Sequence, residues 1–96
     1  MIFEWDETKN RRNREKHGLD FNVLSLFDWE NALVADRTRL GDGEPRFAAL
    51  GLYAGKLHTV VFTKRGRNIR VISFRRSNRR EEKAYESATQ KDDDQS

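Results

Sequence analysis

The first part of the chain, up to residue 29, is predicted to form two helices, the first from the signals at its ends and the second from the spacing of its apolar residues. Residues 6–17 contain no apolar side chain, yet Asp6 is a favourable helix N-cap and Gly18 a favourable helix stop. We therefore expect a surface helix here, held to the protein by apolar residues at its two ends. Asp20 is a second N-cap, and apolar residues at helical spacing over residues 21–29 predict a second helix.

After these helices the pattern changes to that of strands. Runs rich in β-branched and aromatic residues are separated by glycine-containing turns, of which residues 39–45 hold two glycines and the only proline. Asn78 and Glu81 have the spacing of a capping box, which predicts a last helix ending near Ala88. With a short apolar segment at the N-terminus, the expected strands are residues 2–5, 32–38, 46–53, 57–65 and 68–76.

The expected order of elements is β-α-α-β-β-β-β-α. Consecutive strands with short connections favour an antiparallel sheet, and helices at both ends of the sequence make the fold class α+β. A chain of 96 residues has material for one small core. We expect a single domain over residues 1–90 and a disordered acidic tail over residues 91–96.

The strand register follows from the expected turn at Gly66 and Arg67. A two-residue turn places Phe62 opposite Val71, Val60 opposite Ser73 and His58 opposite Arg75. Arg70 and Arg75 then project from opposite faces of the sheet. An error of one residue in the turn would move one strand's side chains to the other face.

Charge is concentrated in one segment. Residues 64–83 carry nine Lys or Arg against two Glu, while the rest of the chain has ten against fourteen acids. Residues 65–80 hold seven arginines and no acid. Solvated surface explains such a run in the simplest case. Arginine nevertheless suits bidentate phosphate binding, so nucleic acid is the favoured polyanion.

Composition narrows the remaining classes of function. The chain has no cysteine, no apolar run long enough to cross a membrane and no signal peptide at its start, so we expect a cytoplasmic protein. Its two histidines are far apart in sequence and lack metal-ligand spacing, so we expect no metal and no cofactor. Cleavage of RNA needs neither, because the 2′-OH is the nucleophile and arginines can stabilise the phosphate.

The sequence resembles the BrnT family of type II toxins. The matching order runs from "FEWDETK" through "KHG", "GE.R" and "TKRG..IRVISFRR" to "RREE..Y". Two positions differ from the family, which usually has a small residue where Phe74 and Ser77 stand. The residues that carry the resemblance are Phe3 to Asp6, Asn13, Lys16 to Gly18, Phe21, Gly43, Glu44, Arg46, Arg65, Gly66, Arg70, Ile72, Ser73, Arg75, Arg76, Glu81 and Tyr85.

The resemblance implies a RelE/ParE-like fold and an endoribonuclease that inhibits translation. It also implies a partner, a BrnA-like antitoxin of the ribbon-helix-helix type, which sequesters the toxin and brings it to promoter DNA only as a complex. A binding module that holds nucleic acid without cutting it is the alternative. We expect no membrane partner.

The candidate site residues fall into two groups. We expect Arg46, Arg70, Arg75 and Arg76 to hold and stabilise phosphate, with His17 as general acid or base. We expect RNA binding by Lys64, Arg65, Arg79, Arg80 and Tyr85.

Simpler readings exist for several of these residues. Arg70 can pair with an acid on a neighbouring strand, and Arg46 can pair with Glu44. His17 can serve as a helix C-terminal cation, and Tyr85 can pack in the core. His58 is expected at the surface.

Overall fold

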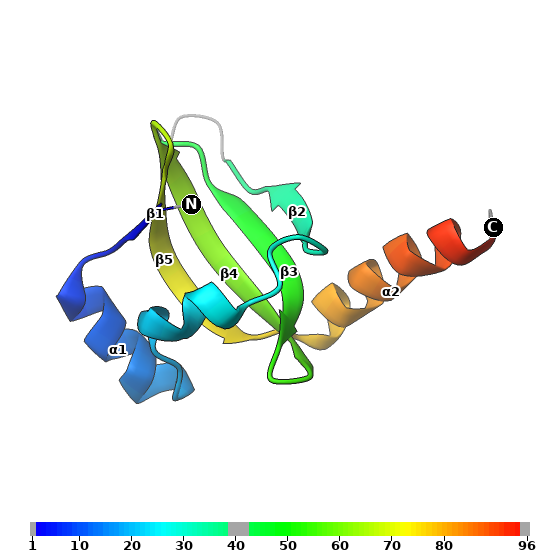
Figure 1. Ribbon diagram of the computed structural model, residues 1–96, viewed down its shortest axis with the longest axis horizontal. Coiled ribbons are helices and arrows are strands. Elements are labelled where there is room, and N and C mark those ends of the chain that lie inside the picture. Colours follow the sequence, from blue (N-terminus) through cyan, green and yellow to red (C-terminus); the bar gives the residue numbers. More distant parts are fainter. Residues whose placement is uncertain (1, 39–42, 95–96) are drawn as a thin grey trace.

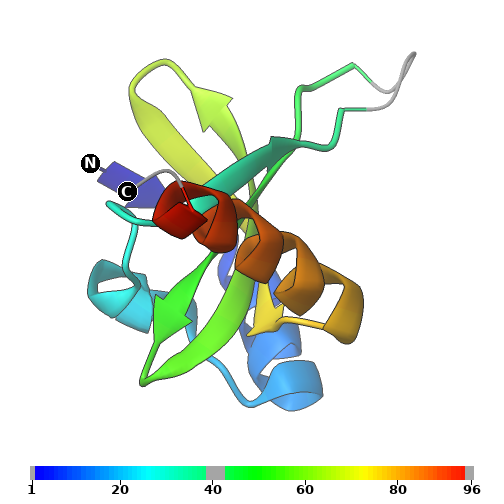
Figure 2. The ribbon, with the colours of Figure 1, turned by 90° about the vertical axis from the view of Figure 1, so that its right-hand side faces the viewer.

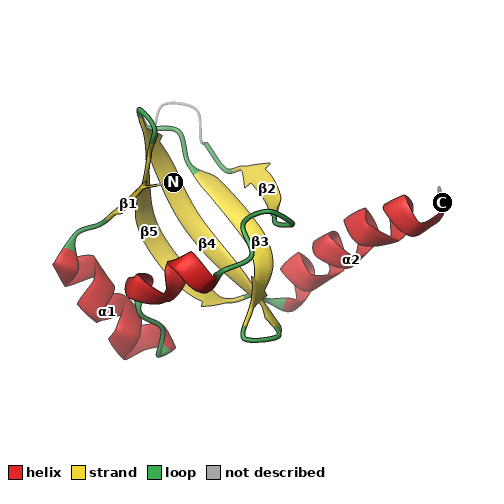
Figure 3. Ribbon diagram, viewed as in Figure 1, coloured by secondary structure: helices red, strands yellow, loops and turns green. Residues whose placement is uncertain are grey.

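The computed structural model describes residues 2–38 and 43–94 and confirms the α+β class. The strands form one five-stranded sheet. Figures 1 and 3 show that this sheet is curved and that the helices lie beside it. In chain order the elements are β1 (Ile2–Glu4), α1 (Glu7–His17), η1 (Phe21–Leu26), β2 (Leu33–Asp36), β3 (Phe47–Tyr53), β4 (Lys56–Arg65), β5 (Asn68–Arg76) and α2 (Arg79–Asp94).

The sheet has the strand order β1-β5-β4-β3-β2. Strands β2 to β5 form the expected antiparallel meander. The expected antiparallel sheet is corrected at one edge, where β1 pairs with β5 in parallel. A parallel pair needs a long connection, and here the helices and three strands provide it.

Two helices differ from their expected form. The segment after Asp20 is a short 3₁₀-helix, not an α-helix. In a 3₁₀-helix residues three apart eclipse one another, which directs Phe21 and Leu24 to the same side. Helix α2 continues past Ala88 into the segment expected to be disordered. Residues 39–42 of the expected turn and residues 95–96 of the expected tail lie outside the described residues.

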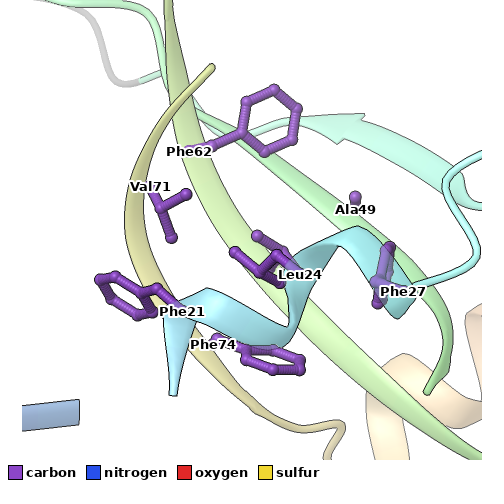
Figure 4. Close-up of a cluster of buried hydrophobic side chains, with 8 residues drawn as sticks. Phe21, Leu24, Phe27, Ala49, Phe62, Val71 and Phe74 are labelled. Atoms are coloured by element: carbon purple, nitrogen blue, oxygen red, sulfur yellow. The ribbon is translucent and has the colours of Figure 1, made fainter. Parts of the chain in front are cut away.

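The hydrophobic core lies between η1 and one face of the sheet (Figure 4). Gly51 is required by this packing, since an added Cβ would come within 2.7 Å of the Phe27 ring. Burying this cluster is the main source of stability for so small a domain. The cluster consists of Phe21, Leu24, Phe27, Ala49, Val60, Phe62, Val71 and Phe74.

Two buried asparagines attach α1 to the rest of the protein. Asn13 donates to the carbonyl oxygens of Leu19 (2.9 Å) and Phe74 (2.8 Å) and accepts from the Phe74 N–H (3.0 Å). Asn10 accepts from the Phe21 N–H at 2.9 Å and donates to Asp20 at 3.0 Å. Polar side chains therefore hold this helix, in addition to the apolar residues expected at its ends.

A β-bulge in β5 corrects the expected register. Phe62 lies opposite Val71 as predicted, but the register shifts at this point and Val60 then lies opposite Phe74. The extra residue turns Phe74 into the core, where it is fully buried. It also makes the prediction for the two arginines wrong, because Arg70 and Arg75 now project from the same face.

Helix α2 leaves the end of β5 and extends away from the sheet (Figures 1 and 2). The expected capping box at its start is confirmed, since Asn78 and Glu81 exchange hydrogen bonds of 2.9 and 2.8 Å. Among residues 79–89 of the helix, Glu81 is buried, Tyr85 and Ala88 are half-buried, and the others are exposed. No helix in the described ranges is long and apolar enough to span a bilayer.

Candidate functional site

The candidate cations are divided between the two ends of β5. Arg70 and Arg75 are five residues apart, which corresponds to roughly 16 Å along a strand. Each of the two is also held by a different acid, Arg70 by Glu4 and Arg75 by Glu81. The two ends therefore have to be considered as separate surfaces.

At the first end, most cations already have partners. Arg70 lies opposite Glu4 of β1, with nitrogen and oxygen 3.5 Å apart, as the simpler reading of this residue proposed. Arg65 pairs with Glu44 at 2.8 Å, so Glu44 is not the partner of Arg46. The Lys64 ammonium lies 5.0 Å from the centre of the Phe47 ring.

Arg46 lies beside the same end, just before β3. Its backbone N–H donates to the Thr38 hydroxyl at 2.9 Å, and its side chain is exposed. This places it nearer to Arg70 than to the opposite end of β5, because Phe47 is in register with Phe62, next to Thr63 and Arg70.

At the second end, Arg75 is held by a buried carboxylate. Its two terminal nitrogens donate to the two oxygens of Glu81 at 2.7 and 2.9 Å. Burial by itself raises the pKa of Glu81, but hydrogen bonds from Arg75 and from the Asn78 N–H outweigh it and keep the pKa low. Arg75 is thus fixed in position and partly neutralised.

A shallow cavity of about 360 Å³ lies beside this end of β5. We call it the histidine cavity, because His17 from the end of α1 and His58 from β4 both line it. Arg76, the cross-strand neighbour of His58, is exposed and makes no ion pair within residues 2–38 and 43–89. The other lining residues are Leu19, Tyr53, Ala54 and Lys56.

His17 ends helix α1 beside two cations. Burial lowers its pKa, and the positive charges of Lys16 and Arg75 lower it further. The neutral imidazole therefore predominates near pH 7, which allows it to accept a proton. The position of His17 at a helix C-terminus does not reverse this shift.

His58 is buried, so the expectation of a surface residue was wrong. Its Nδ1 lies 2.8 Å from the Lys56 carbonyl oxygen, which requires a proton on Nδ1. In the described chain no fully buried side-chain nitrogen lacks a partner, so the unbonded Nε2 keeps some contact with solvent. His58 also lines the histidine cavity. Burial lowers the pKa of His58, although its hydrogen bond to Lys56 opposes the shift.

A signal for His58 was present in the sequence. It alternates in phase with Val60 and Phe62, both of which face the core. The in-phase position predicts burial, and a histidine at the rim of a core is well placed to combine a fixed ring with access to solvent.

The three candidates on α2 do not form one basic patch. Arg79 lies on an exposed surface with Glu82, Lys83 and Glu86, where the charges alternate. Arg80 is exposed, and Tyr85 is half-buried on the side of α2 that also carries Glu81. The structure thus places these residues beyond the end of β5 without joining them to the histidine cavity.

The histidine cavity combines groups that suit phosphate chemistry. The guanidinium of Arg76 can bind an anion, and the imidazoles of His17 and His58 can transfer protons. Within the described ranges no three His, Asp or Glu residues are grouped as a metal ion would require.

Comparison with models of protein families gives a match. A family described as "Ribonuclease toxin, BrnT, of type II toxin-antitoxin system" matches residues 5–81, which include α1, the whole sheet from β2 to β5 and the start of α2. No curated protein matches the chain.

Proposed function

Because the chain belongs to the BrnT family of ribonuclease toxins of type II toxin-antitoxin systems, we propose that it cuts RNA internally at the histidine cavity. The observation that supports this most directly is the meeting of His17, His58 and Arg76 in that cavity. We further propose that the fold is of the RelE/ParE type. The α+β order and the curved sheet are compatible with that assignment.

The proposed reaction uses the nucleophile that RNA carries. The 2′-OH attacks the adjacent phosphorus, the bond from phosphorus to the 5′-oxygen breaks, and a 2′,3′-cyclic phosphate remains. A neutral histidine takes the 2′ proton, and the second histidine is placed to return a proton to the departing oxygen. Arg76 stabilises the negative charge on the phosphoryl oxygens. Arg75 does not line the cavity and is held by Glu81, so it stays a predicted phosphate ligand with a supporting role. Because arginines supply this positive charge, the scheme requires no metal ion.

The remaining candidates have secondary roles in this scheme. Arg46 and Arg70 stay predicted phosphate ligands, but at the opposite end of β5 they would contact a different part of the strand. The same holds for Lys64 and Arg65 beside them. Arg79, Arg80 and Tyr85 stay predicted contacts for RNA that leaves the cavity towards α2.

The test is RNA cleavage by purified protein in the presence of EDTA. Wild-type protein is expected to cut total RNA, whereas Arg76→Ala and His17→Gln should lower the rate by at least about 10²-fold, the usual loss for one transition-state contact. Arg67→Ala removes an exposed cation from the distant β4–β5 turn and should leave the rate unchanged. RNA binding without cleavage by folded wild-type protein would favour the binding module instead.

Membership of this family also implies a cognate antitoxin. We propose that it is of the ribbon-helix-helix type, covers the toxin in the cytoplasm and carries it to promoter DNA. Free toxin would then inhibit translation. Induction alone should arrest growth, and co-expression with the antitoxin should restore growth and yield a complex on purification.

A further inference from the structure

A second cavity, of about 220 Å³, lies between α1 and the bulged part of β5. We call it the α1 trough. Ile72 and Ser73 of β5 form one side of it, and His17 lines it as well as the histidine cavity. The two cavities are therefore neighbours that share one residue.

Three cations of α1 line this trough, namely Lys9, Arg12 and Lys16. At 3.6 residues per turn they fall within about 60° of the helix circumference and spread over roughly 10 Å of its length. In the described structure all four ion pairs involve other cations, so none of the three is neutralised by an acid.

Folding does not explain this arrangement. Like charges three or four residues apart destabilise a helix by a few tenths of a kcal/mol for each pair. The three cations nevertheless face the trough, because Asn13 on the same face of α1 is anchored to β5. The Asn13 amide donates to the Phe74 carbonyl oxygen and accepts from the Phe74 N–H. The side of α1 that turns towards β5 is thus fixed by a buried contact and not by its charges.

We propose that the α1 trough binds the phosphodiester backbone of the RNA strand next to the phosphate that is cut. The inference rests on the proposed function, since the shared His17 connects the trough to the histidine cavity. A strand whose reactive phosphate lies at His17 and Arg76 would place its adjoining phosphates along Lys16, Arg12 and Lys9. The trough thereby sets the direction in which RNA leaves the site along α1.

The test measures binding of a fluorescein-labelled 2′-O-methyl RNA oligonucleotide, which cannot be cut, by fluorescence anisotropy over a series of KCl concentrations. The trough variant is Lys9→Ala/Arg12→Ala/Lys16→Ala. The control, Arg11→Ala/Arg37→Ala/Arg67→Ala, removes the same charge from exposed positions outside the trough, and Arg11 lies on the far side of α1. Circular dichroism checks that each variant is folded.

The trough variant should lose about 2 from the slope of log affinity against log salt concentration, since each phosphate contact to single-stranded RNA contributes about 0.7. The control variant should keep most of the wild-type slope. Equal slopes for the two variants, or no binding by the wild-type protein, would overturn the proposal. So would an unchanged RNA affinity accompanied by weaker binding of the antitoxin.

Cleavage of unmodified RNA separates this inference from the proposed function. If the wild-type protein cleaves RNA but the trough variant binds RNA as the control does, the trough proposal is refuted and the proposed ribonuclease activity stands. If binding depends on the trough but the wild-type protein cleaves no RNA, the ribonuclease activity is refuted and the trough stands as an RNA-binding surface.

Discussion

Replacing Asn13 by alanine tests whether polar contacts hold α1 to the sheet. The substitution removes the acceptor of the Phe74 N–H and the donors to the carbonyl oxygens of Phe74 and Leu19. Each buried backbone group left without a partner costs about 1–3 kcal/mol. Phe74 is fully buried, so losing the partners of its two groups should lower the free energy of unfolding by roughly 2–6 kcal/mol.

Urea unfolding followed by tryptophan fluorescence measures this loss, because Trp5 and Trp29 both pack against the core. The matched control is Asn31→Ala, which removes an exposed hydrogen bond of 3.0 Å to Asp28 and should cost well under 1 kcal/mol. Equal losses for Asn13→Ala and Asn31→Ala would refute the reasoning.

Asn13→Asp sharpens the same test. The carboxylate can still accept from the Phe74 N–H, but it faces two carbonyl oxygens to which it cannot donate. At pH 7 we expect Asn13→Asp to lower the free energy of unfolding more than Asn13→Ala does. At acid pH the loss caused by Asn13→Asp should be smaller than at pH 7, because the protonated carboxyl can donate one hydrogen bond. A deficit that does not change with pH would argue against a direct contact with these carbonyls.

Three further predictions concern pH and the core. Hydrogen bonds, above all from the Asn22 N–H, hold the pKa of Asp20 at about 2. The contribution of Asp20 to stability is therefore complete above about pH 4 and is lost as the pH falls towards 2. In Asp20→Asn the urea midpoint should depend less on pH over that range. Burial lowers the pKa of both His17 and His58 from 6.5, and the proposed reaction needs one of them neutral and the other protonated. The plot of kcat/KM for RNA cleavage against pH should therefore be bell-shaped with its maximum below pH 6.5, and His17→Gln should remove one limb of the bell. Phe74→Ala should lower the free energy of unfolding by roughly 3–5 kcal/mol, and a loss under 1 kcal/mol in urea unfolding would contradict its place in the core.

Much of the local structure could be predicted from the sequence because its signals lie within a few residues. The cap at Asp6, the left-handed stop at Gly18 and the capping box of Asn78 and Glu81 all occur as expected. The three long strands were predicted because β-branched and aromatic residues mark them. The second helix was assigned the wrong type, since apolar residues three apart suit a 3₁₀-helix as well as an α-helix.

The positions of Phe74 and Ser77, the two residues expected to differ from the family, were decided only by the structure. Phe74 fills the core because the bulge turns it inwards, and the rings of Tyr53 and Phe27 lie 5.5 and 6.4 Å from it. Ser77 is buried, and its hydroxyl lies 2.8 Å from that of Thr59. Neither placement has a local signal, because both depend on contacts between distant strands.

The sequence by itself determined the class of fold, the basic character of β5 and the residues that carry the family pattern. Only the tertiary structure decided which cations meet, since one inserted residue in β5 reverses the faces of the side chains after it. It separated Arg46 and Arg70 from Arg75 and Arg76, and it brought His58 to His17 across 41 positions of sequence. A functional site depends on such long-range contacts, whereas caps, turns and periodicity act over short stretches of chain.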